Sequence, residues 1–536
     1  MSMLKVALAQ INPCVGDLDY NANKIISNIK RAKKAKADIV IFPELSLTGY
    51  PPEDLLLKPH FIDENLRYLK IIEKESKGII VLLGFVDKCN DRIYNSCAFL
   101  KDGKLKDVYR KIYLPNYGVF DEKRYFVPGN LLSFYAFKGY KFCVSICEDI
   151  WRKGFVNNLA SKKLDFIINI SASPFHLGKI SMREEIISNL AKQTNAFVFY
   201  ADLVGGQDEL VFDGTSMVVS PSGKIAAVAN RFKEDFLLFE LGNNKKYPVK
   251  KISIKQEDEA FSALRLGLCD YVHKNSFKRV IIGVSGGIDS AVVAALAASA
   301  LGKDNVCALI MPSRYTSKAT FTDAKILCEN LGIDYKIINI NEMLDAYLKI
   351  LWPLFKKKDG TKTEENLQAR IRGNLLMAYS NEFGYLVLNT GNKSEVSCGY
   401  CTLYGDMVGG FGLLKDIPKM LVYKIARYIN HIYPKPAIPL SVIRRAPSAE
   451  LKPNQKDTDS LPPYSLLDPI VKLYVEDDFS LEKIVKKGFN QKLARKVMTM
   501  IDSSEYKRRQ GPIGIKITPR AFGKDRRMPI TNKFNY

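Results

Sequence analysis

The chain has 536 residues, which is too long for one hydrophobic core and indicates two to four domains. Its hydrophobic fraction of 47% is typical of a globular protein, and its longest apolar runs are too short to cross a membrane. The net charge of +23 is spread along the chain without a zinc-finger or RNA-binding signature, which favours attraction of polyphosphate substrates over nucleic-acid binding.

Ten cysteines are scattered without the spacing of a disulfide framework, which indicates a reducing compartment. Cys398 and Cys401 form a lone C-x-x-C pair, and without a second pair or spaced histidines they do not favour a zinc site. The first residues, Met1 to Lys5, lead directly into a strand-like run and show no signal-peptide pattern. We therefore expect a cytoplasmic protein that does not bind a membrane.

The first half of the chain alternates β-type runs with amphipathic stretches. Repeated strand–helix–strand units mixed with hairpins predict an α/β architecture of two sheets covered by helices. The predicted strands cover residues 5–12, 37–45, 78–86, 95–100, 108–114, 140–147, 164–171, 196–203 and 216–229. The predicted helices cover residues 19–36, 63–77 and 181–193.

Three reactive residues, Glu44, Lys111 and Cys147, stand where predicted strands end. A cysteine thiolate attacks amide carbons well once a neighbour removes its proton, and a glutamate can be that base and later return the proton to departing ammonia. A lysine ammonium can hold the thiolate and stabilise the oxyanion. Taken singly, each has an ordinary structural alternative: a capping or ion-pairing carboxylate, a surface charge and a buried core thiol.

The sequence around these residues resembles the nitrilase superfamily, whose triad is Glu-Lys-Cys. The matching segments are Phe42–Leu45, Arg110–Pro115 and Ile146–Asp149. The resemblance covers residues 1–245 and implies an αββα sandwich. Similarity to the glutamine-using branch further implies three residues that bind glutamine: Tyr117, Ser173 and Lys179. It also implies that Glu122 is a supporting acid.

A polar, charged stretch with a central proline and no sustained period follows, and we expect a linker at 246–258 and a second domain at 259–536. The second half alternates strands with helices, which predicts a doubly wound parallel sheet that binds a nucleotide at the carboxyl ends of its strands. The predicted strands cover residues 280–284, 306–311, 335–340 and 385–389. The predicted helices cover residues 256–273, 291–301, 318–331, 342–352 and 363–382.

A glycine-rich loop, Ser285-Gly286-Gly287-Ile288-Asp289-Ser290, joins the first of these strands to an alanine-rich helix. Paired glycines let backbone N–H groups approach an anion, and the helix N-terminus adds a partial positive charge. The loop resembles the pyrophosphate loop of ATP pyrophosphatases, which implies that Ser285, Gly286, Gly287, Ile288, Asp289 and Ser290 bind ATP. Two alternatives are a Gly-x-Ser-x-Gly nucleophile elbow at 283–287 and a purely structural glycine turn.

Two further segments carry polar residues that can reach this loop. Arg370 and Asn374 are four residues apart and share one face of their predicted helix, for which the alternative is an exposed basic surface. Thr390 and Glu395 follow the strand at 385–389, in a turn that can lie on the same rim of the sheet as the loop. Glu395 can then share a magnesium ion with Asp289.

These segments, with Tyr404–Asp406, Leu461–Tyr464 and Lys507–Arg509, resemble NAD synthetase. The resemblance implies that Thr390 contacts ATP and that Mg²⁺ is the cofactor, held by Asp289 and Glu395. It implies four residues that bind deamido-NAD: Arg370, Asn374, Glu395 and Lys507.

As a whole, the chain is similar to the glutamine-dependent NAD synthetase family. The resemblance implies that deamido-NAD, ATP and glutamine are converted to NAD, AMP, pyrophosphate and glutamate. We also expect a homo-oligomer without a nucleic-acid partner. One alternative is another pyrophosphate-loop amidotransferase, such as a GMP synthetase, and a second is a non-catalytic nucleotide- or nucleic-acid-binding protein.

Overall fold

The computed structural model describes residues 3–242, 247, 249–252, 255–355 and 361–534. The chain divides into two compact units, Met1–Ile254 and Lys255–Tyr536, and both are α/β, as predicted. Residues 246, 248, 253 and 254 of the predicted linker lie outside the described residues, and helix α5 (Gln256–Lys274) begins within its last part. Within the described ranges, every helix is too short or too polar to cross a membrane.

The first unit contains two six-stranded sheets and one separate hairpin. The first sheet consists of β14 (Asp235–Leu241), β1 (Leu4–Gln10), β2 (Ile39–Ile41), β3 (Ile80–Cys89), β4 (Arg92–Lys101) and β5 (Lys104–Arg110), in that order. The second consists of β13 (Ile225–Val228), β12 (Met217–Val219), β9 (Phe197–Asp202), β8 (Phe166–Ser171), β7 (Tyr140–Ile146) and β6 (Phe134–Phe137). The hairpin is formed by β10 (Val204–Gln207) and β11 (Leu210–Asp213).

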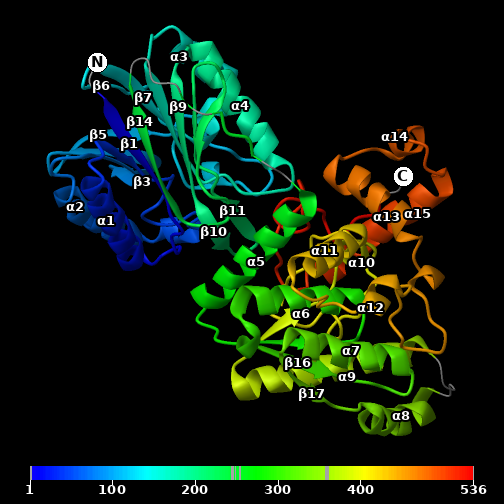
Figure 1. The fold of residues 1–536 in the computed structure, drawn as a ribbon. Coiled ribbons are helices and arrows are strands. Elements are labelled where there is room, and N and C mark those ends of the chain that lie inside the picture. The colour runs from blue at the N-terminus through cyan, green and yellow to red at the C-terminus, as the bar shows by residue number, and fades with distance from the viewer. Residues whose placement is uncertain (1–2, 243–246, 248, 253–254, 356–360, 535–536) are drawn as a thin grey trace. The chain divides into compact units, whose positions relative to one another are not determined.

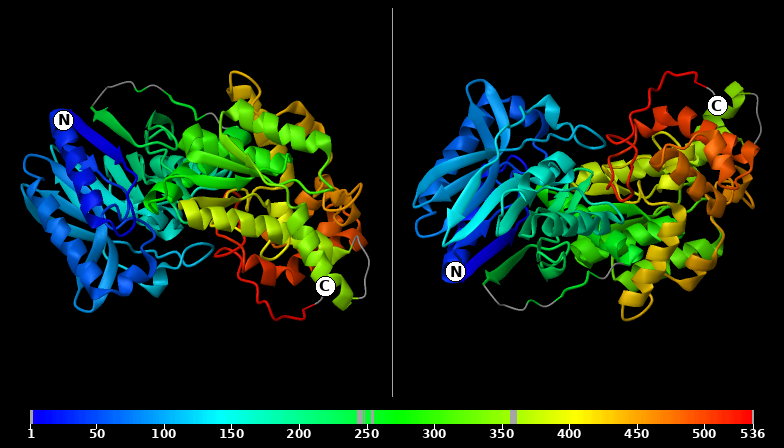
Figure 2. Two further views of the ribbon diagram at one scale, coloured as in Figure 1. Left: turned by 90° about the horizontal axis from the view of Figure 1, so that it is seen from below. Right: turned by 90° about the horizontal axis from the view of Figure 1, so that it is seen from above.

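Helices cover the outer face of each sheet, so the first unit is the αββα sandwich that the sequence predicts (Figure 1). Helices α1 (Leu18–Lys34) and α2 (Pro59–Lys74) pack on the first sheet. Helices α3 (Lys153–Ala160) and α4 (Lys179–Thr194) pack on the second. The inner faces of the two sheets pack against each other, and Figure 2 gives two further views of these layers.

Strand β1 shows why its sequence is apolar at nearly every position. Val6 and Leu8 face the second sheet, whereas Ala7 and Ala9 face the helices, and all four are buried. A strand covered on both faces reads as a continuous apolar run rather than as an alternating one. The prediction of a single strand at 216–229 is wrong. Gly223, at φ +76°, lies in the turn of a hairpin that divides this stretch into β12 and β13.

The second unit contains a five-stranded sheet in which all pairs are parallel, as predicted. Its strands are β17 (Asp334–Ile337), β16 (Val306–Ile310), β15 (Val280–Gly283), β18 (Leu386–Asn389) and β19 (Phe411–Gly412), in that order. The order reverses between β15 and β18, because the chain proceeds from β15 outward in one direction and returns beside it as β18. Ligands of open α/β sheets bind beyond the carboxyl ends of the strands at such a point.

Helices cover both faces of this sheet, which confirms the doubly wound architecture. On one face, α8 (Asn341–Phe355) and α9 (Lys362–Phe383) pack on Ile281, Leu309 and Val387. On the other, α6 (Ile288–Leu301) contacts β15 and β16 and packs beside α5 and α11. The remaining helices are α7 (Lys318–Leu331), α10 (Lys393–Cys398), α11 (Lys419–Ile432), α12 (Leu440–Arg444), α13 (Tyr464–Val471), α14 (Leu481–Lys486), α15 (Gln491–Ser503) and α16 (Glu505–Arg508).

Candidate active sites

The structure brings Glu44, Lys111 and Cys147 together in the first unit, each within three residues of the end of a strand: β2, β5 and β7, respectively. The Nζ atom of Lys111 lies 2.7 Å from Oε1 of Glu44, and both side chains are fully buried. Cys147 directly follows β7, is 5% exposed, and its thiol lies within the electrostatic influence of Glu44 and Lys111. The three side chains therefore form one cluster rather than three separate structural features.

Both carboxylate oxygens of Glu44 are held in place. Oε1 accepts a hydrogen bond from Nδ2 of Asn95 at 2.7 Å, in addition to the contact with Lys111. Oε2 accepts one from the backbone N–H of Ala172 at 2.8 Å. A base fixed in this way does not have to be reoriented before it accepts a proton, which is an advantage in general-base catalysis.

Burial and neighbouring charges determine the protonation states in this cluster. Burial, reinforced by the carboxylate of Glu44, raises the pKa of the Cys147 thiol well above its usual range, so the thiol is protonated at rest. Burial alone would lower the pKa of Lys111, but Glu122 and Glu44 outweigh it and raise this pKa, so the lysine is an ammonium. The cluster thus holds a thiol, a carboxylate that can take its proton and a fixed positive charge.

Glu122 is a second carboxylate on the same lysine. Its Oε1 atom accepts from Nζ of Lys111 at 2.8 Å and from the hydroxyl of Tyr50 at 2.9 Å. Burial raises the pKa of Glu122 to about 7, even though the Lys111 ammonium opposes the shift. Glu122 is therefore placed to orient the lysine, and its supporting role stays a prediction.

Two of the three residues predicted to bind glutamine, Tyr117 and Lys179, lie close enough to Cys147 for its thiol to influence their pKa values. The Tyr117 hydroxyl donates to Oε2 of Glu148 at 2.8 Å, and Ser173 is buried, with its N–H donated to Oδ1 of Asp202 at 2.9 Å. The Nζ atom of Lys179 lies 4.3 Å from the centre of the Trp151 ring, and the Cys147 thiol and the Glu148 carboxylate both influence its pKa. Burial and the nearby Arg183 guanidinium lower that pKa.

Glu148 lies beside these residues, although the sequence analysis did not single it out. It follows Cys147 directly, is buried, and its Oε1 atom pairs with Nη2 of Arg152 at 2.6 Å. Its second oxygen is the one that Tyr117 contacts. The signal available in the sequence was an acidic residue directly after a candidate nucleophile, but the sequence could not show which way its side chain points.

The second unit has a cavity of about 310 Å³ at the carboxyl ends of its strands, at the point where the strand order reverses. The predicted loop Ser285–Ser290, the end of β16 and Thr390 beyond β18 all line it. Gly286 has φ +82°, and a Cβ atom there would lie 2.2 Å from the carbonyl oxygen of Thr320, so only glycine fits. Helix α6 starts at Ile288, which directs its N-terminal N–H groups toward the cavity.

The contacts of Ser285 favour a phosphate-binding loop over a nucleophile elbow. Its Oγ atom lies 3.1 Å from Oγ of Ser290 and accepts the N–H of Gly287 at 3.2 Å. Among the described residues that line the cavity there is no histidine to take a proton from this hydroxyl. The two serines therefore shape the loop, which leaves its other N–H groups for a ligand.

Asp289 and Glu395 converge on a third residue, Lys419, which the sequence did not single out. The Nζ atom of Lys419 lies 2.5 Å from Oδ2 of Asp289 and 2.9 Å from Oε1 of Glu395. Asp289 also accepts from Nδ2 of Asn392 at 3.1 Å. Burial raises the pKa of Asp289 to about 6, against the opposing effect of Lys419. Two carboxylates thus point at one cation position beside the loop.

The remaining predicted ligands are not gathered in the cavity. Arg370 and Asn374 are exposed, and α9 instead presents Arg372 to the cavity, with its Nε atom bonded to the carbonyl of Met311 at 3.0 Å. Lys507 donates to the carbonyls of Gly399 and Cys401, both at 2.7 Å. Lys507 therefore orders the segment that follows α10, and Cys398 at the end of α10 and Cys401 just beyond it are both free thiols.

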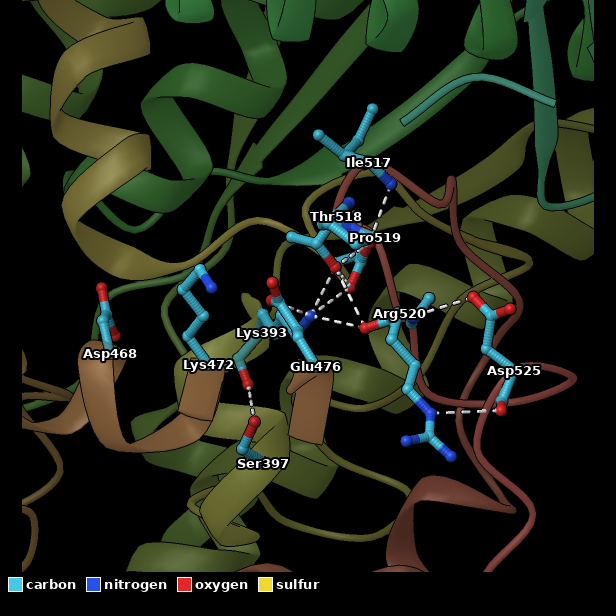
Figure 3. A network of polar contacts seen from close by, with 12 residues as sticks. Lys393, Ser397, Asp468, Lys472, Glu476, Ile517, Thr518, Pro519, Arg520 and Asp525 are labelled. Atoms are coloured by element: carbon cyan, nitrogen blue, oxygen red, sulfur yellow. Dashed lines mark hydrogen bonds and ion pairs between the residues drawn. The ribbon is translucent and has the colours of Figure 1, made fainter. Parts of the chain in front are cut away.

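Lys393 fixes α10, the short helix that carries Glu395. Its side chain is fully buried, and Figure 3 shows it pointing toward the C-terminal segment. Its Nζ atom contacts four groups: Asp416 at 2.9 Å, Glu476 at 2.8 Å, the Thr518 hydroxyl at 2.5 Å and the carbonyl of Arg520 at 2.9 Å. Asp416 in turn accepts the N–H groups of Ile517 and Thr518, each at 2.7 Å. This network joins α10 to the end of the chain.

Replacing Lys393 with methionine is expected to lower the free energy of unfolding of the second unit by about 3–5 kcal/mol, because the buried carboxylates of Asp416 and Glu476 would lose their counter-charge. Chemical denaturation followed by circular dichroism measures the loss. The matched control is Lys472→Met, which removes a pair with Asp477 from a side chain that is 58% exposed, and which should cost at most about 1 kcal/mol. Equal losses for the two variants would contradict this account of the network.

Known proteins resemble the chain over its whole length. A sequence model of the NAD synthase family matches residues 260–511, and one of the carbon–nitrogen hydrolase family matches residues 5–245. The glutamine-dependent NAD(+) synthetase of Thermotoga maritima is 46% identical, over 100% of this chain and 99% of the relative. That of Acinetobacter baylyi is also 46% identical, over 99% of each.

A solved structure agrees with these sequence relatives. The glutamine-dependent NAD+ synthetase of Acinetobacter baumannii, solved in complex with ADP, is 44% identical over 99% of each chain, with a TM-score of 0.81. Full-length similarity of this kind argues against a GMP synthetase and against a non-catalytic binding protein. The two units, their buried clusters and these relatives agree: the chain belongs to the glutamine-dependent NAD+ synthetase family.

Proposed function

We propose that the first unit hydrolyses glutamine to glutamate and ammonia, and that the second uses ATP to join the ammonia to the nicotinate carboxylate of deamido-NAD. The products are NAD, AMP, pyrophosphate and glutamate. The observation that carries the proposal is the pairing, on one chain, of a buried Glu44–Lys111–Cys147 cluster with a glycine-loop cavity. We further propose functional domains at 1–245 and 259–536, joined by a linker at 246–258.

In the first half-reaction, Glu44 removes the proton of the Cys147 thiol as the sulfur attacks the amide carbon of glutamine. Lys111 stabilises the developing oxyanion, and Glu44 returns the proton to the departing ammonia, leaving a thioester. Water, deprotonated by Glu44, then attacks the thioester carbon and releases glutamate and the thiol. The raised pKa of Cys147 requires such a base, because the resting group is a thiol.

Charged groups around Cys147 suit the free amino acid end of glutamine. The buried carboxylate of Glu148 can accept the α-ammonium, and the Lys179 ammonium can pair with the α-carboxylate. Tyr117 orients Glu148 through its 2.8 Å hydrogen bond, and Ser173 offers a further hydroxyl. An arrangement with one group of each sign favours an amino acid over a simple amide.

In the second half-reaction, the carboxylate of deamido-NAD attacks the α-phosphorus of ATP and expels pyrophosphate. Ammonia then attacks the acyl-adenylate carbon and releases AMP. The N–H groups of the loop, the α6 N-terminus and Lys419 balance the charge of the phosphates. Arg370, Asn374, Glu395 and Lys507 are proposed to contact deamido-NAD, with the exposed Arg370 and Asn374 acting outside the nucleotide cavity.

Magnesium fits the carboxylate pair of this site. Asp289 and Glu395 direct oxygens at one cation position, which Lys419 reaches in this structure, and carboxylate oxygens are the ligands that Mg²⁺ prefers. The described residues provide no third acidic, histidine or cysteine ligand there, so phosphate oxygens and water would complete the shell. Bound there by Asp289 and Glu395, the ion would neutralise phosphate charge.

Two properties of the whole protein belong to the same proposal. A cytoplasmic location agrees with ten cysteines that are all free. Assembly into a homo-oligomer is proposed from the family, and sedimentation of the purified protein tests it.

A single assay separates the proposed function from its alternatives. The protein is supplied with ATP, Mg²⁺, deamido-NAD and either glutamine or ammonium, and NAD is measured by mass spectrometry. NAD formation from both nitrogen sources is expected. A parallel reaction contains xanthosine monophosphate in place of deamido-NAD, and its amidation would indicate a GMP synthetase. No product from either of the two nucleotides would indicate a protein that binds nucleotides without catalysis.

A further inference from the structure

We infer that Asp149 is a positioning residue that holds Cys147 and Lys111 in place for the glutaminase reaction. The inference rests on the proposed function of that cluster and adds a residue that does not itself touch glutamine. Asp149 is fully buried and lies two residues beyond Cys147, in the 3-10 turn Cys147–Trp151. The mechanism above leaves this buried carboxylate without a task.

The Asp149 carboxylate accepts four hydrogen bonds that bracket both catalytic residues. Oδ1 accepts the backbone N–H groups of Ile112 at 3.1 Å and Tyr113 at 2.9 Å, the two residues that follow Lys111. Oδ2 accepts the N–H of Ile146 at 2.9 Å, which directly precedes Cys147, and the Tyr109 hydroxyl at 2.7 Å. One side chain thus ties the segment of the lysine to the segment of the thiol.

The backbone at Cys147 explains why such a tie is needed. Cys147 has φ +41°, a left-handed conformation that a side chain with a Cβ atom rarely adopts. It follows the extended residue Ile146, at φ −124°, so the chain turns sharply at the thiol and presents it beyond the strand. Strained residues of this kind persist only where surrounding contacts hold them, and the Ile146–Asp149 hydrogen bond spans this turn.

The chemistry of the four donors requires a carboxylate. An ionised aspartate accepts at both oxygens, whereas an asparagine of the same size accepts at one and carries two N–H groups at the other position. Asp149→Asn would therefore set N–H groups against N–H groups on one side. Burial raises the pKa of Asp149 to about 6, while the hydrogen bonds from Ile146, Tyr113 and Tyr109 favour its ionised form.

The test compares Asp149→Asn with wild type in the full chain. Glutamine-driven NAD synthesis should fall about 100-fold, because a displacement of about 1 Å at reacting groups has an effect of this size. The loss should appear in kcat, with the KM for glutamine changed less than about threefold, because the groups proposed to bind glutamine are retained. Ammonium-driven synthesis should be unchanged, which reports that the chain is folded.

A second readout follows the thiol without requiring glutamine hydrolysis. The rate at which iodoacetamide alkylates Cys147, measured by peptide mass spectrometry, should fall at least about tenfold in Asp149→Asn. The thiol would be displaced from Glu44, which could then no longer take its proton efficiently. An alkylation rate equal to that of wild type would overturn the inference, even if wild type did not hydrolyse glutamine. Absence of glutamine hydrolysis in wild type would instead overturn the proposed function.

Two further variants separate positioning from general stability. Asp165→Asn is the matched control, since its Oδ2 accepts the N–H of Lys141 at 2.7 Å at the opposite end of β7, and both readouts should stay at the wild-type level. If Asp149→Asn does not fold, Tyr109→Phe decides, because it removes one of the four donors and keeps the carboxylate. A loss of about threefold to tenfold in glutamine-driven kcat is expected, and an unchanged kcat would overturn the inference.

Discussion

Replacing Cys147 with alanine is expected to abolish NAD synthesis from glutamine, by a factor of at least about 10³, and to leave synthesis from ammonium salts unchanged. The sulfur is the only atom of the buried cluster that can form the thioester, and neither Glu44 nor Lys111 can replace it as a nucleophile. The second unit holds the nucleotide cavity within its own residues, so ammonia is all that it needs from the first unit. Initial rates with each nitrogen source measure the separation.

Cys143→Ala is the matched control for this variant. Cys143 is a fully buried thiol on the same strand, β7, and burial raises its pKa, but it belongs to the core between the second sheet and its helices. Both nitrogen sources should continue to support synthesis in this variant. Loss of ammonium-driven synthesis in a folded Cys147→Ala protein would contradict the proposed division of labour.

Replacing Asp289 with asparagine is expected to impair synthesis from both nitrogen sources, by about 10²–10³-fold. Asp289 and Glu395 share one cation position, and an amide would remove half of the negative charge that holds a cation beside the loop. The adenylation step precedes the entry of ammonia, so the origin of the nitrogen should not matter. Comparison of kcat with glutamine and with ammonium measures this directly.

Asp304→Asn provides the control, because this exposed aspartate lies just beyond the other end of α6 and faces no cavity residue. It should retain wild-type rates with both sources. A folded Asp289→Asn variant that kept normal turnover with either source would exclude Asp289 as an essential ligand. Glutamine hydrolysis without ATP or deamido-NAD, measured in parallel, should not require Asp289.

Periodicity predicted both architectures because both units are regular. In the second unit, the alternation of strands and helices allowed few sheet topologies. Helix α7 has the predicted bounds, Lys318–Leu331. The first unit was harder, since β6 has four residues that are exposed or half-buried and β14 is only partly buried. Their places are determined by pairing with β7 and β1, which is tertiary information.

The sites were predictable only where local motifs carry them. Glu44, Lys111 and Cys147 each stand in a recognisable segment, and the loop Ser285–Ser290 is continuous in sequence. Lys419 lies 130 residues from Asp289, and its role follows only from the fold that brings them together. On α9, helical spacing paired Arg370 with Asn374 correctly, but spacing alone could not show that Arg372 faces the cavity.

The fate of the glutamine amide nitrogen tests the central claim most directly. Glutamine labelled with ¹⁵N in its side-chain amide is supplied with ATP, Mg²⁺ and deamido-NAD, and the masses of NAD and glutamate are recorded. The account predicts NAD heavier by one mass unit in its carboxamide, in step with unlabelled glutamate, and no labelled NAD from Cys147→Ala. Labelled glutamine that stays intact, or NAD that forms without the label, would contradict it.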